Sequence, residues 1–282
     1  MSGFDAEWLK IRELVDFRAR NVDLAEKVAA HFAGKETLSI LDLGCGTGAN
    51  LRASYALYPE MQHWHLVDHD LALLDVGKQT LMHWADEART EADGTLCLKK
   101  GGYKLHIKFL QCDLSRDMDG LFQNDPDLVT ASALFDLVSV DWLARFVDMI
   151  AKKRCSVYAL LTYDGEEKWL PSLPLDEAVH AGFLAHQHRD KGFGAALGPD
   201  APAALRSHLE AFRFKVDVAD SPWRLKQERD GDLIVALADG IASASCESGV
   251  ISKEQAADWR SLRSKAHSAH IGHQDLFAAP PC

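Results

Sequence analysis

The sequence predicts an α/β protein in which helices cover both faces of a mostly parallel, twisted sheet, a three-layer sandwich. Short apolar runs alternate along the chain with segments of helical periodicity. The first of these runs ends in a cluster of glycines that opens a helix, so the local pattern is strand, turn, helix. With 282 residues, the chain is long enough for one large domain or for a core domain with an appendage.

Composition narrows the class of protein. Hydrophobic residues make up 47% and charged residues 26%, the balance of a globular protein. The net charge of −11 opposes binding to nucleic acid, which needs cationic groups to neutralise phosphates. No signal-peptide pattern and no apolar run of membrane-spanning length is present. The six cysteines are scattered without a C-x-x-C pair, which predicts a reducing, cytoplasmic location and no metal site.

Periodicity gives the order of the elements. The strands are predicted at Leu38–Leu43, Trp64–Val67, Ile107–Cys112, Leu128–Ala131 and Val157–Leu161. Helices are predicted at residues 5–32, at residues 49–57, from the second strand to about Arg89, and after the fourth strand. A hairpin is expected to turn at Gly101-Gly102, because two apolar arms flank this glycine pair.

The second half of the chain is less regular. Prolines and glycines loosen the pattern at about residues 164–212, which predicts an insertion or lid. A strand at Phe214–Val218 follows, and a helical excursion is predicted at about residues 226–267 from helical spacing at Leu233–Ala244 and Lys253–Lys265. Gln274–Ala279 is predicted to form the last strand.

The glycine turn runs Asp42-Leu-Gly44-Cys45-Gly46-Thr-Gly48 between the first strand and its helix. Glycines let the backbone approach a ligand closely, and the helix N-terminus offers free N–H groups beside it. A dinucleotide fingerprint is formally satisfied here, and so is the glycine loop of a protein that binds S-adenosylmethionine.

Two acids favour the second alternative. Asp68 ends the second predicted strand and Asp113 ends the third. Carboxyl ends of parallel strands meet at one edge of such a sheet, where ligands bind. A carboxylate at Asp68 can accept both hydroxyls of a ribose, which nicotinamide and methionine cofactors both require.

At these residues the chain resembles the class I (Rossmann-like) S-adenosylmethionine-dependent methyltransferases, over roughly residues 35–165. Asp42 and the three alternating glycines match the family's acid-x-G-x-G-x-G motif, and Asp113 resembles the residue that accepts a hydrogen bond from the adenine amine. The resemblance implies a seven-stranded sheet with an antiparallel last strand. The methyltransferase domain is expected at residues 35–282, after a helical segment at residues 1–34 that helical spacing predicts. No Asn-Pro-Pro-Tyr-like segment follows the fourth strand.

The resemblance further implies S-adenosylmethionine as the methyl donor and S-adenosylhomocysteine as its product. The residues expected at this ligand are Arg20, Asp42, Gly44, Cys45, Gly46, Asp68, His69, Asp113, Leu114 and Ser132. Arg20 is expected to pair either with the carboxylate of the methionine end or, in a surface ion pair, with Asp16. His63, His65 and His69 form a conceivable metal triad, but strand alternation places His69 beyond the other two and favours ordinary histidines.

The acceptor side is expected beyond the fifth strand. Tyr163 and Asp164 lie just past this strand and are candidate catalytic groups, together with His186. His186 belongs to a polar segment between about Ala185 and Gly194 that is predicted to close over the substrate, or to be an exposed loop. The residues expected to bind substrate are Asp136, His188, Arg189 and Lys191.

The sequence therefore favours methyl transfer to an oxygen or nitrogen of a small polar metabolite. Methylation of protein or RNA stays open as a variant. The alternatives from other classes are an NAD(P)-dependent oxidoreductase and a protein that binds S-adenosylmethionine without catalysis.

Overall fold

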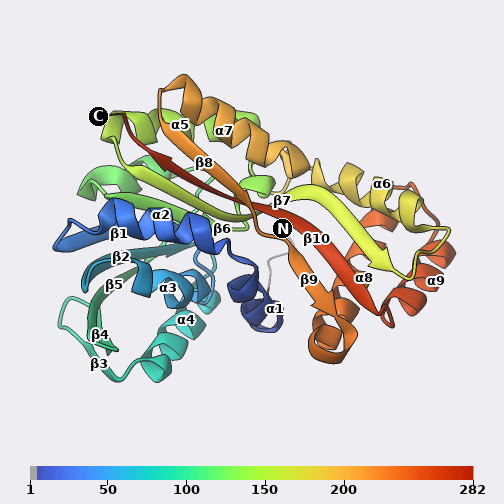
Figure 1. Ribbon diagram of the computed structural model, residues 1–282, viewed down its shortest axis with the longest axis horizontal. Helices are drawn as coiled ribbons and strands as arrows, with labels where there is room; N and C mark the ends of the chain where they lie inside the picture. Colours follow the sequence, from blue (N-terminus) through green and yellow to red (C-terminus); the bar gives the residue numbers. More distant parts are fainter. Residues whose placement is uncertain (1–4, 282) are drawn as a thin grey trace.

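The computed structural model describes residues 5–281 and contains a single sheet of ten strands (Figure 1). The strands are β1 (Thr37–Leu43), β2 (Met61–Asp68), β3 (Glu87–Thr90), β4 (Leu96–Lys100), β5 (Tyr103–Gln111), β6 (Leu128–Ser132), β7 (Ser156–Leu170), β8 (Lys215–Asp220), β9 (Trp223–Lys226) and β10 (Ser268–Ala279). The helices are α1 (Ala6–Ala19), α2 (Val22–Phe32), α3 (Ala49–Ser54), α4 (Leu71–Trp84), α5 (Val140–Lys153), α6 (Asp176–Gln187), α7 (Ala201–Ala211), α8 (Gln227–Glu247) and α9 (Lys253–Arg263).

Seven of the strands form the sheet that the resemblance implies. Their order is β5-β2-β1-β6-β7-β10-β8, and β10 runs antiparallel to both of its neighbours. The sheet has ten strands rather than seven, because β3 and β4 extend one edge and β9 pairs with β10. The hairpin that joins β4 to β5 turns at Gly101 and Gly102, as predicted.

Helices cover both faces of this sheet, which confirms the three-layer sandwich. On one face, α2, α3 and α4 pack through residues such as Phe32, Leu51 and Leu81. On the other face, α5 and α7 pack through Phe146 and Leu205. The two apolar layers bury the parallel strands from both sides, as expected for a sheet of this type.

The first predicted helix is wrong as a single element. Residues 5–32 form two helices, because Arg20 leaves the helical conformation with a ψ of 137°. Asn21 then caps α2 by accepting a hydrogen bond from Leu24 N, and its own N–H donates to the buried carboxylate of Asp275. Asp275, which is distant in the sequence, therefore holds the chain at the break between the two helices. The break is not visible in the sequence, because helical periodicity continues on both sides of it.

The fifth predicted strand is also longer than expected. β7 continues from the predicted end at Leu161 to Leu170, so residues 164–170 are strand and not the start of a lid. Leu161 has a φ of +52° and donates its N–H to Asp275 across a local irregularity in the pairing with β10. Such bulges bend a strand and re-aim it, and only one face of β7 is well covered beyond this point.

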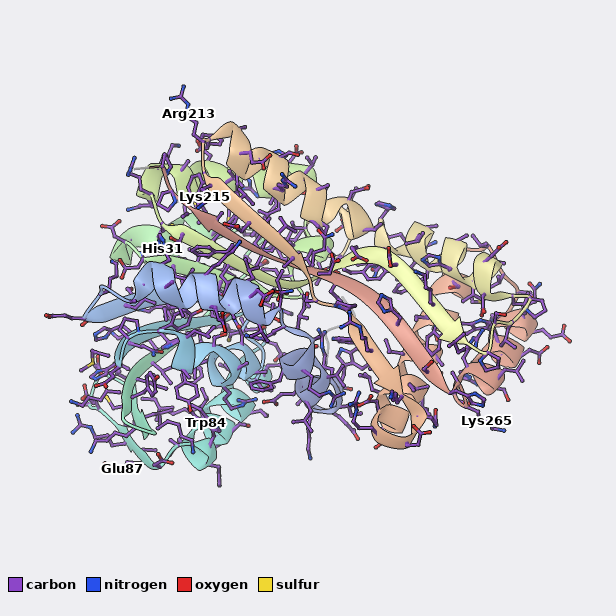
Figure 2. All side chains as sticks on the ribbon, in the orientation of Figure 1. His31, Trp84, Glu87, Arg213, Lys215 and Lys265 are labelled. Atoms are coloured by element: carbon purple, nitrogen blue, oxygen red, sulfur yellow. The ribbon has the colours of Figure 1, made fainter. Side chains whose placement is uncertain are left out.

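The bent ends of β7 and β10 carry a group of helices. Figure 1 shows α6, α8 and α9 gathered along these two strands, away from the main body of the sheet. In Figure 2, Lys265 marks the far end of this group, and Trp84 and Glu87 mark the opposite corner of the molecule. α8 and α9 match the predicted excursion, whereas α7 packs on the sheet itself and β9 was not predicted.

The helix predicted to run to about Arg89 ends earlier. α4 stops at Trp84, and the edge strand β3 follows at Glu87–Thr90. Every residue of β3 is exposed, so no apolar alternation marks it in the sequence. Among residues 5–281, no helix combines the length and apolar character needed to cross a bilayer.

Candidate functional site

The glycine loop joins β1 to α3 in a conformation that few residues other than glycine adopt. Gly44, Gly46 and Gly48 have φ values of +65°, +52° and +77°. The N–H of Cys45 donates to Val67 O at 2.9 Å, and the N–H of Gly46 donates to Asp68 Oδ2 at 2.9 Å. The loop is thus tied to the carboxyl end of the neighbouring strand β2.

Helix α1 covers this loop. A Cβ atom at Gly46 would lie 2.9 Å from Leu9 Cδ1 of α1, so a larger residue would have to move this side chain in addition to adopting a positive φ. Glu13 of α1 pairs with Arg52 of α3 at 2.7 Å, and Arg52 also donates to Thr47 O in the loop. In Figure 1, α1 lies between the body of the sheet and the group of helices that contains α8. α1 therefore forms one wall of the site.

The two predicted strand-end acids both lie at the carboxyl edge. Asp68 is only 7% exposed in its side chain, and its two oxygens accept from Gly46 N and Asp70 N. His69 Nδ1 lies 3.2 Å from Asp68 Oδ1. Asp113 is 44% exposed, and hydrogen bonds from Ser115 hold its pKa below the ordinary value. Asp68 thus shapes the loop, whereas Asp113 is open to a ligand.

The other residues expected at the ligand surround the same edge. Cys45 and Leu114 are buried, and Leu114 O accepts a hydrogen bond from Trp142 Nε1 at 2.7 Å. Ser132 is the last residue of β6. The structure therefore gathers these residues at the ends of β1, β2, β5 and β6.

Arg20 lies beneath the loop. Its guanidinium donates to Ser54 Oγ at 2.6 Å and to Asn50 Oδ1 at 2.9 Å, and Asn50 in turn donates to Asp42 Oδ1. The expected surface ion pair between Arg20 and Asp16 is wrong, since Asp16 pairs with Arg12 instead. Asp42 is 1% exposed, and burial raises its pKa to about 7 against the opposing effects of Asn50 and Arg20.

The raised pKa of Asp42 predicts a pH dependence of stability. Between the unfolded pKa near 4 and the folded pKa, the native state holds a proton that the unfolded state has lost. Stability therefore falls as pH rises through this window. The variant Asp42→Asn should gain about 2–3 kcal/mol over the wild type between about pH 5 and about pH 8.

Urea unfolding of both proteins at the two pH values measures this difference. Asp23→Asn, an exposed change in the first turn of α2, is the control and should show no such trend. An Asp42→Asn difference that stays constant with pH would mean that Asp42 is ionised throughout.

Tyr163 and Asp164 were expected just past the fifth strand, and the structure places them within β7. Neighbouring strand residues point to opposite faces, so they do not serve one site together. The Tyr163 hydroxyl is buried without a partner among residues 5–281, and burial raises its pKa. Asp164 accepts from Glu166 N, and its carboxylate lies against Gly272.

Asp136 lies in the short 3-10 turn Phe135–Leu137 that follows β6. It is 8% exposed, and burial raises its pKa to about 6 although Arg12 and Lys191 lower it. Its Oδ1 atom has no hydrogen-bond partner in the described part of the chain. A buried carboxylate oxygen without a partner is uncommon and marks a place where a ligand can bind.

The polar segment predicted as a lid is held to α8. His186 Nε2 lies 3.2 Å from Glu247 Oε2, and Arg189 donates to Glu247 O at 2.8 Å. Lys191 Nζ contacts His186 Nδ1 at 3.0 Å, and His188 Nδ1 lies 3.3 Å from Ala196 O. The structure thus turns His186 and Arg189 toward the end of α8, while the charge of Lys191 acts on Asp136.

Sequence reasoning missed the contribution of α1 and β10. Arg12 of α1 stacks on Trp223 at 4.9 Å, and Trp223 Nε1 donates to Asp16. The His273 ring lies 4.9 Å from Trp223 and 6.2 Å from Tyr163. For His273, the one sequence feature that could have indicated a place in the site was a polar residue within an apolar strand. No sequence feature indicated that α1 would reach the site, because its contacts are with residues far along the chain.

The three histidines of the conceivable metal triad do not come together. His63 and His65 line a hollow of about 460 Å³ with His106 and Lys108, whereas His69 lies beside Asp68. Within residues 5–281, no group of three or more His, Cys, Asp or Glu side chains is arranged to hold a metal ion.

Comparison with known proteins defines the fold. No family model and no curated protein matches the sequence. Among solved structures, a cyclopropane-fatty-acyl-phospholipid synthase-like protein from Lactobacillus casei superposes with a TM-score of 0.54 at 15% identity, covering 98% of this chain and 94% of the other. A candidate methyltransferase from Bacillus halodurans has a TM-score of 0.52 at 12% identity, covering 92% and 99%.

The YcgJ protein from Bacillus subtilis gives a TM-score of 0.50 at 10% identity, covering 92% of this chain and 99% of the other. Such low identities establish the fold alone. The chain therefore has the fold of the class I S-adenosylmethionine-dependent methyltransferases, as the resemblance at the glycine loop implies.

Proposed function

We propose that the protein is a methyltransferase that binds S-adenosylmethionine at the glycine loop and methylates an oxygen or nitrogen of a small polar molecule. The observation that carries this proposal is the loop of three positive-φ glycines, held to β2 by the bond from Gly46 N to Asp68. Asp113 offers an exposed carboxylate at the end of the next strand. The chain's residues fit this ligand at the edge where such sheets bind nucleotides.

Each residue has a proposed part in holding the methyl donor. Asp68 accepts from the ribose hydroxyls, and Asp113 with Leu114 receives the adenine. The remainder of the methyl donor is surrounded by Gly44, Cys45, Gly46, His69 and Ser132. Asp42 and Arg20 support the loop indirectly, since both form hydrogen bonds with Asn50 of α3. The bound donor supplies an activated methyl group, and the chain aligns the acceptor and excludes water.

On the acceptor side, we propose Tyr163 and Asp136 as the groups nearest the reaction, because both are buried with unpaired oxygen atoms. Lys191, whose charge acts on Asp136, and His188 contribute to the substrate region. His186 and Arg189 contact Glu247, and Asp164 accepts a hydrogen bond from Glu166 N, so these three have no part in the proposed site. The five cysteines in the described residues are all free, which supports a reducing, cytoplasmic location.

Isothermal titration calorimetry tests the donor site. S-adenosylhomocysteine should bind with a dissociation constant in the micromolar range, about −8 kcal/mol, and NADP⁺ should give no comparable heat. Gly46→Ala should weaken binding about tenfold or more, because the new Cβ would meet Leu9 at 2.9 Å in a strained backbone.

Gly94→Ala is the matched control. Gly94 also has a positive φ, but a Cβ there meets nothing within 4 Å, so S-adenosylhomocysteine should bind as it does to the wild type. Heat with NADP⁺ and none with S-adenosylhomocysteine would identify an oxidoreductase instead. Wild-type affinity in Gly46→Ala would remove the loop from the proposed site.

A further inference from the structure

We propose that the methyl acceptor is an amine, held as its ammonium ion by Asp136 in the turn that follows β6. This inference rests on the proposed function and names the substrate class of the same site.

Asp136 is close to the glycine loop in the fold. Leu134, two residues before it, lies so close to Gly44 that a Cβ atom there would be 3.4 Å from Leu134 Cδ1. The turn that carries Asp136 follows the carboxyl end of β6, next to the end of β1 in the sheet. An acceptor at Asp136 would therefore stand beside the loop that binds the donor.

Two buried oxygen atoms in this region have no partner among residues 5–281. These are Asp136 Oδ1 and the Tyr163 hydroxyl, from side chains of residues 8% and 5% exposed. Asp136 is one of the charges that raise the pKa of Tyr163, so the two groups interact electrostatically. Leaving such a group unpaired costs about 1–3 kcal/mol, and a ligand that pairs with both removes that cost.

Two cations lie near Asp136, and one of them, Arg12, is already paired with another carboxylate. Arg12 binds Asp16 through two hydrogen bonds of 2.8 and 3.2 Å and stacks on Trp223. Lys191 Nζ contacts His186 Nδ1 at 3.0 Å, and its positive charge lowers the pKa of Asp136.

The unpaired oxygen atoms of the proposed site are those of Asp136 and Tyr163. Glu167 Oε2 on β7 is also buried without a partner among residues 5–281, but the positive charges of His180 and Arg263 act on it. His180 is already engaged with Gly165 O at 2.9 Å. An ammonium ion has only donors to offer and matches the unpaired carboxylate oxygen of Asp136 and the phenol oxygen of Tyr163.

Asp136 also has a role in the chemistry of an amine. The ammonium nitrogen has no lone pair, so one N–H proton must pass to the Asp136 carboxylate before the nitrogen can attack. The nitrogen lone pair then forms the new N–C bond as the C–S bond of the sulfonium breaks, and that bond's electron pair remains on sulfur. The proton on Asp136 leaves to solvent after the product departs.

Saturation-transfer NMR with S-adenosylhomocysteine present tests the proposal without turnover. The probes are butylamine, benzylamine and phenethylamine, each paired with the alcohol and the carboxylate of the same skeleton. One or more of the amines should receive saturation from the wild type, and their paired alcohols and carboxylates should receive none. Asp136→Asn should weaken amine binding about tenfold or more, because it keeps the shape and removes the charge.

Asp141→Asn is the matched control, because Asp141 is an exposed aspartate at the start of α5, five residues further along. It should bind amines as the wild type does. Tyr163→Phe keeps the ring and removes only the hydroxyl, so it should lower amine affinity by a smaller factor. This variant keeps the proposal testable if Asp136→Asn fails to fold.

The amine assignment is overturned if alcohols or carboxylates bind as well as their amines, if none of the amines binds, or if folded Asp136→Asn and Tyr163→Phe both bind amines like the wild type. Calorimetry on the same samples separates the two levels of inference. Failure of the wild type to bind S-adenosylhomocysteine overturns the proposed function. Binding of S-adenosylhomocysteine without selection for amines overturns only the substrate class.

Discussion

Replacing Arg263 with alanine is expected to destabilise the protein by about 3 kcal/mol or more. Arg263 is 1% exposed and binds both carboxylate oxygens of Asp176, through Nε at 3.0 Å and through Nη2. It also donates to Pro171 O at 2.6 Å, and its guanidinium lies 5.7 Å from the ring centre of Trp169 and 5.9 Å from that of Trp259. Removing the cation leaves Asp176 without its charge partner, and Asp176 is one-quarter exposed, which keeps the loss near the lower end of the usual range.

Urea unfolding measures this loss, and Arg260→Ala supplies the control. Arg260 lies one turn earlier on α9 and pairs with Asp239 at 2.7 Å, but both side chains are more than half exposed. An exposed ion pair contributes about 0–1 kcal/mol, so Arg260→Ala should unfold nearly like the wild type. Equal losses in the two variants would show that the buried guanidinium does not hold the group of helices to β7.

Asp68→Ala should lower the affinity for S-adenosylhomocysteine about tenfold or more. Under the proposed function the variant loses charge-assisted hydrogen bonds to the ribose, worth roughly 1.5–3 kcal/mol each. It also loses the acceptor for Gly46 N, so the loop is less well held for binding. Because Asp68 is buried, the change should also cost about 1–3 kcal/mol of stability through two unpaired N–H groups, more than an exposed strand-end acid would cost.

Asp70→Ala separates the two effects of the Asp68 change. Asp70 caps α4 by accepting from Ala72 N at 2.8 Å, and it lies two residues from Asp68. Its loss should cost about 1 kcal/mol of stability and leave the affinity for S-adenosylhomocysteine unchanged. If Asp68→Ala binds S-adenosylhomocysteine like the wild type in calorimetry, the proposed ribose contact is refuted.

The elements that sequence reasoning found are those with a local cause. Gly44, Gly46 and Gly48 are required by a turn whose φ values are positive, and the turn lies between an apolar run and a helix. Asp68 and Asp113 follow apolar runs, and the parallel order of the strands brings their ends to one edge. The hairpin at Gly101 and Gly102 depends only on its own two arms.

The elements that it missed depend on partners far along the chain. Asp275 receives hydrogen bonds from Asn21, Leu161 and Ser221. Asn21 lies at the break between α1 and α2 and Leu161 at the bulge in β7, so one carboxylate binds the backbone at both irregularities. β3 has no buried residue and exists because β4 pairs with it. The same holds for β9, which pairs with the extended part of β10.

The sequence alone therefore determines the alternating strands and helices and the glycine loop with its neighbouring acids, because these follow from periodicity and from backbone conformations that one residue type permits. The antiparallel direction of the last strand was implied only by the family resemblance. The tertiary structure decides how charged side chains are used. It places Arg20 beneath the loop on Asn50, turns His186 to Glu247, and leaves Asp136 buried with an unpaired oxygen. Pairing and desolvation depend on which side chains meet in space, and spacing along the chain does not specify that.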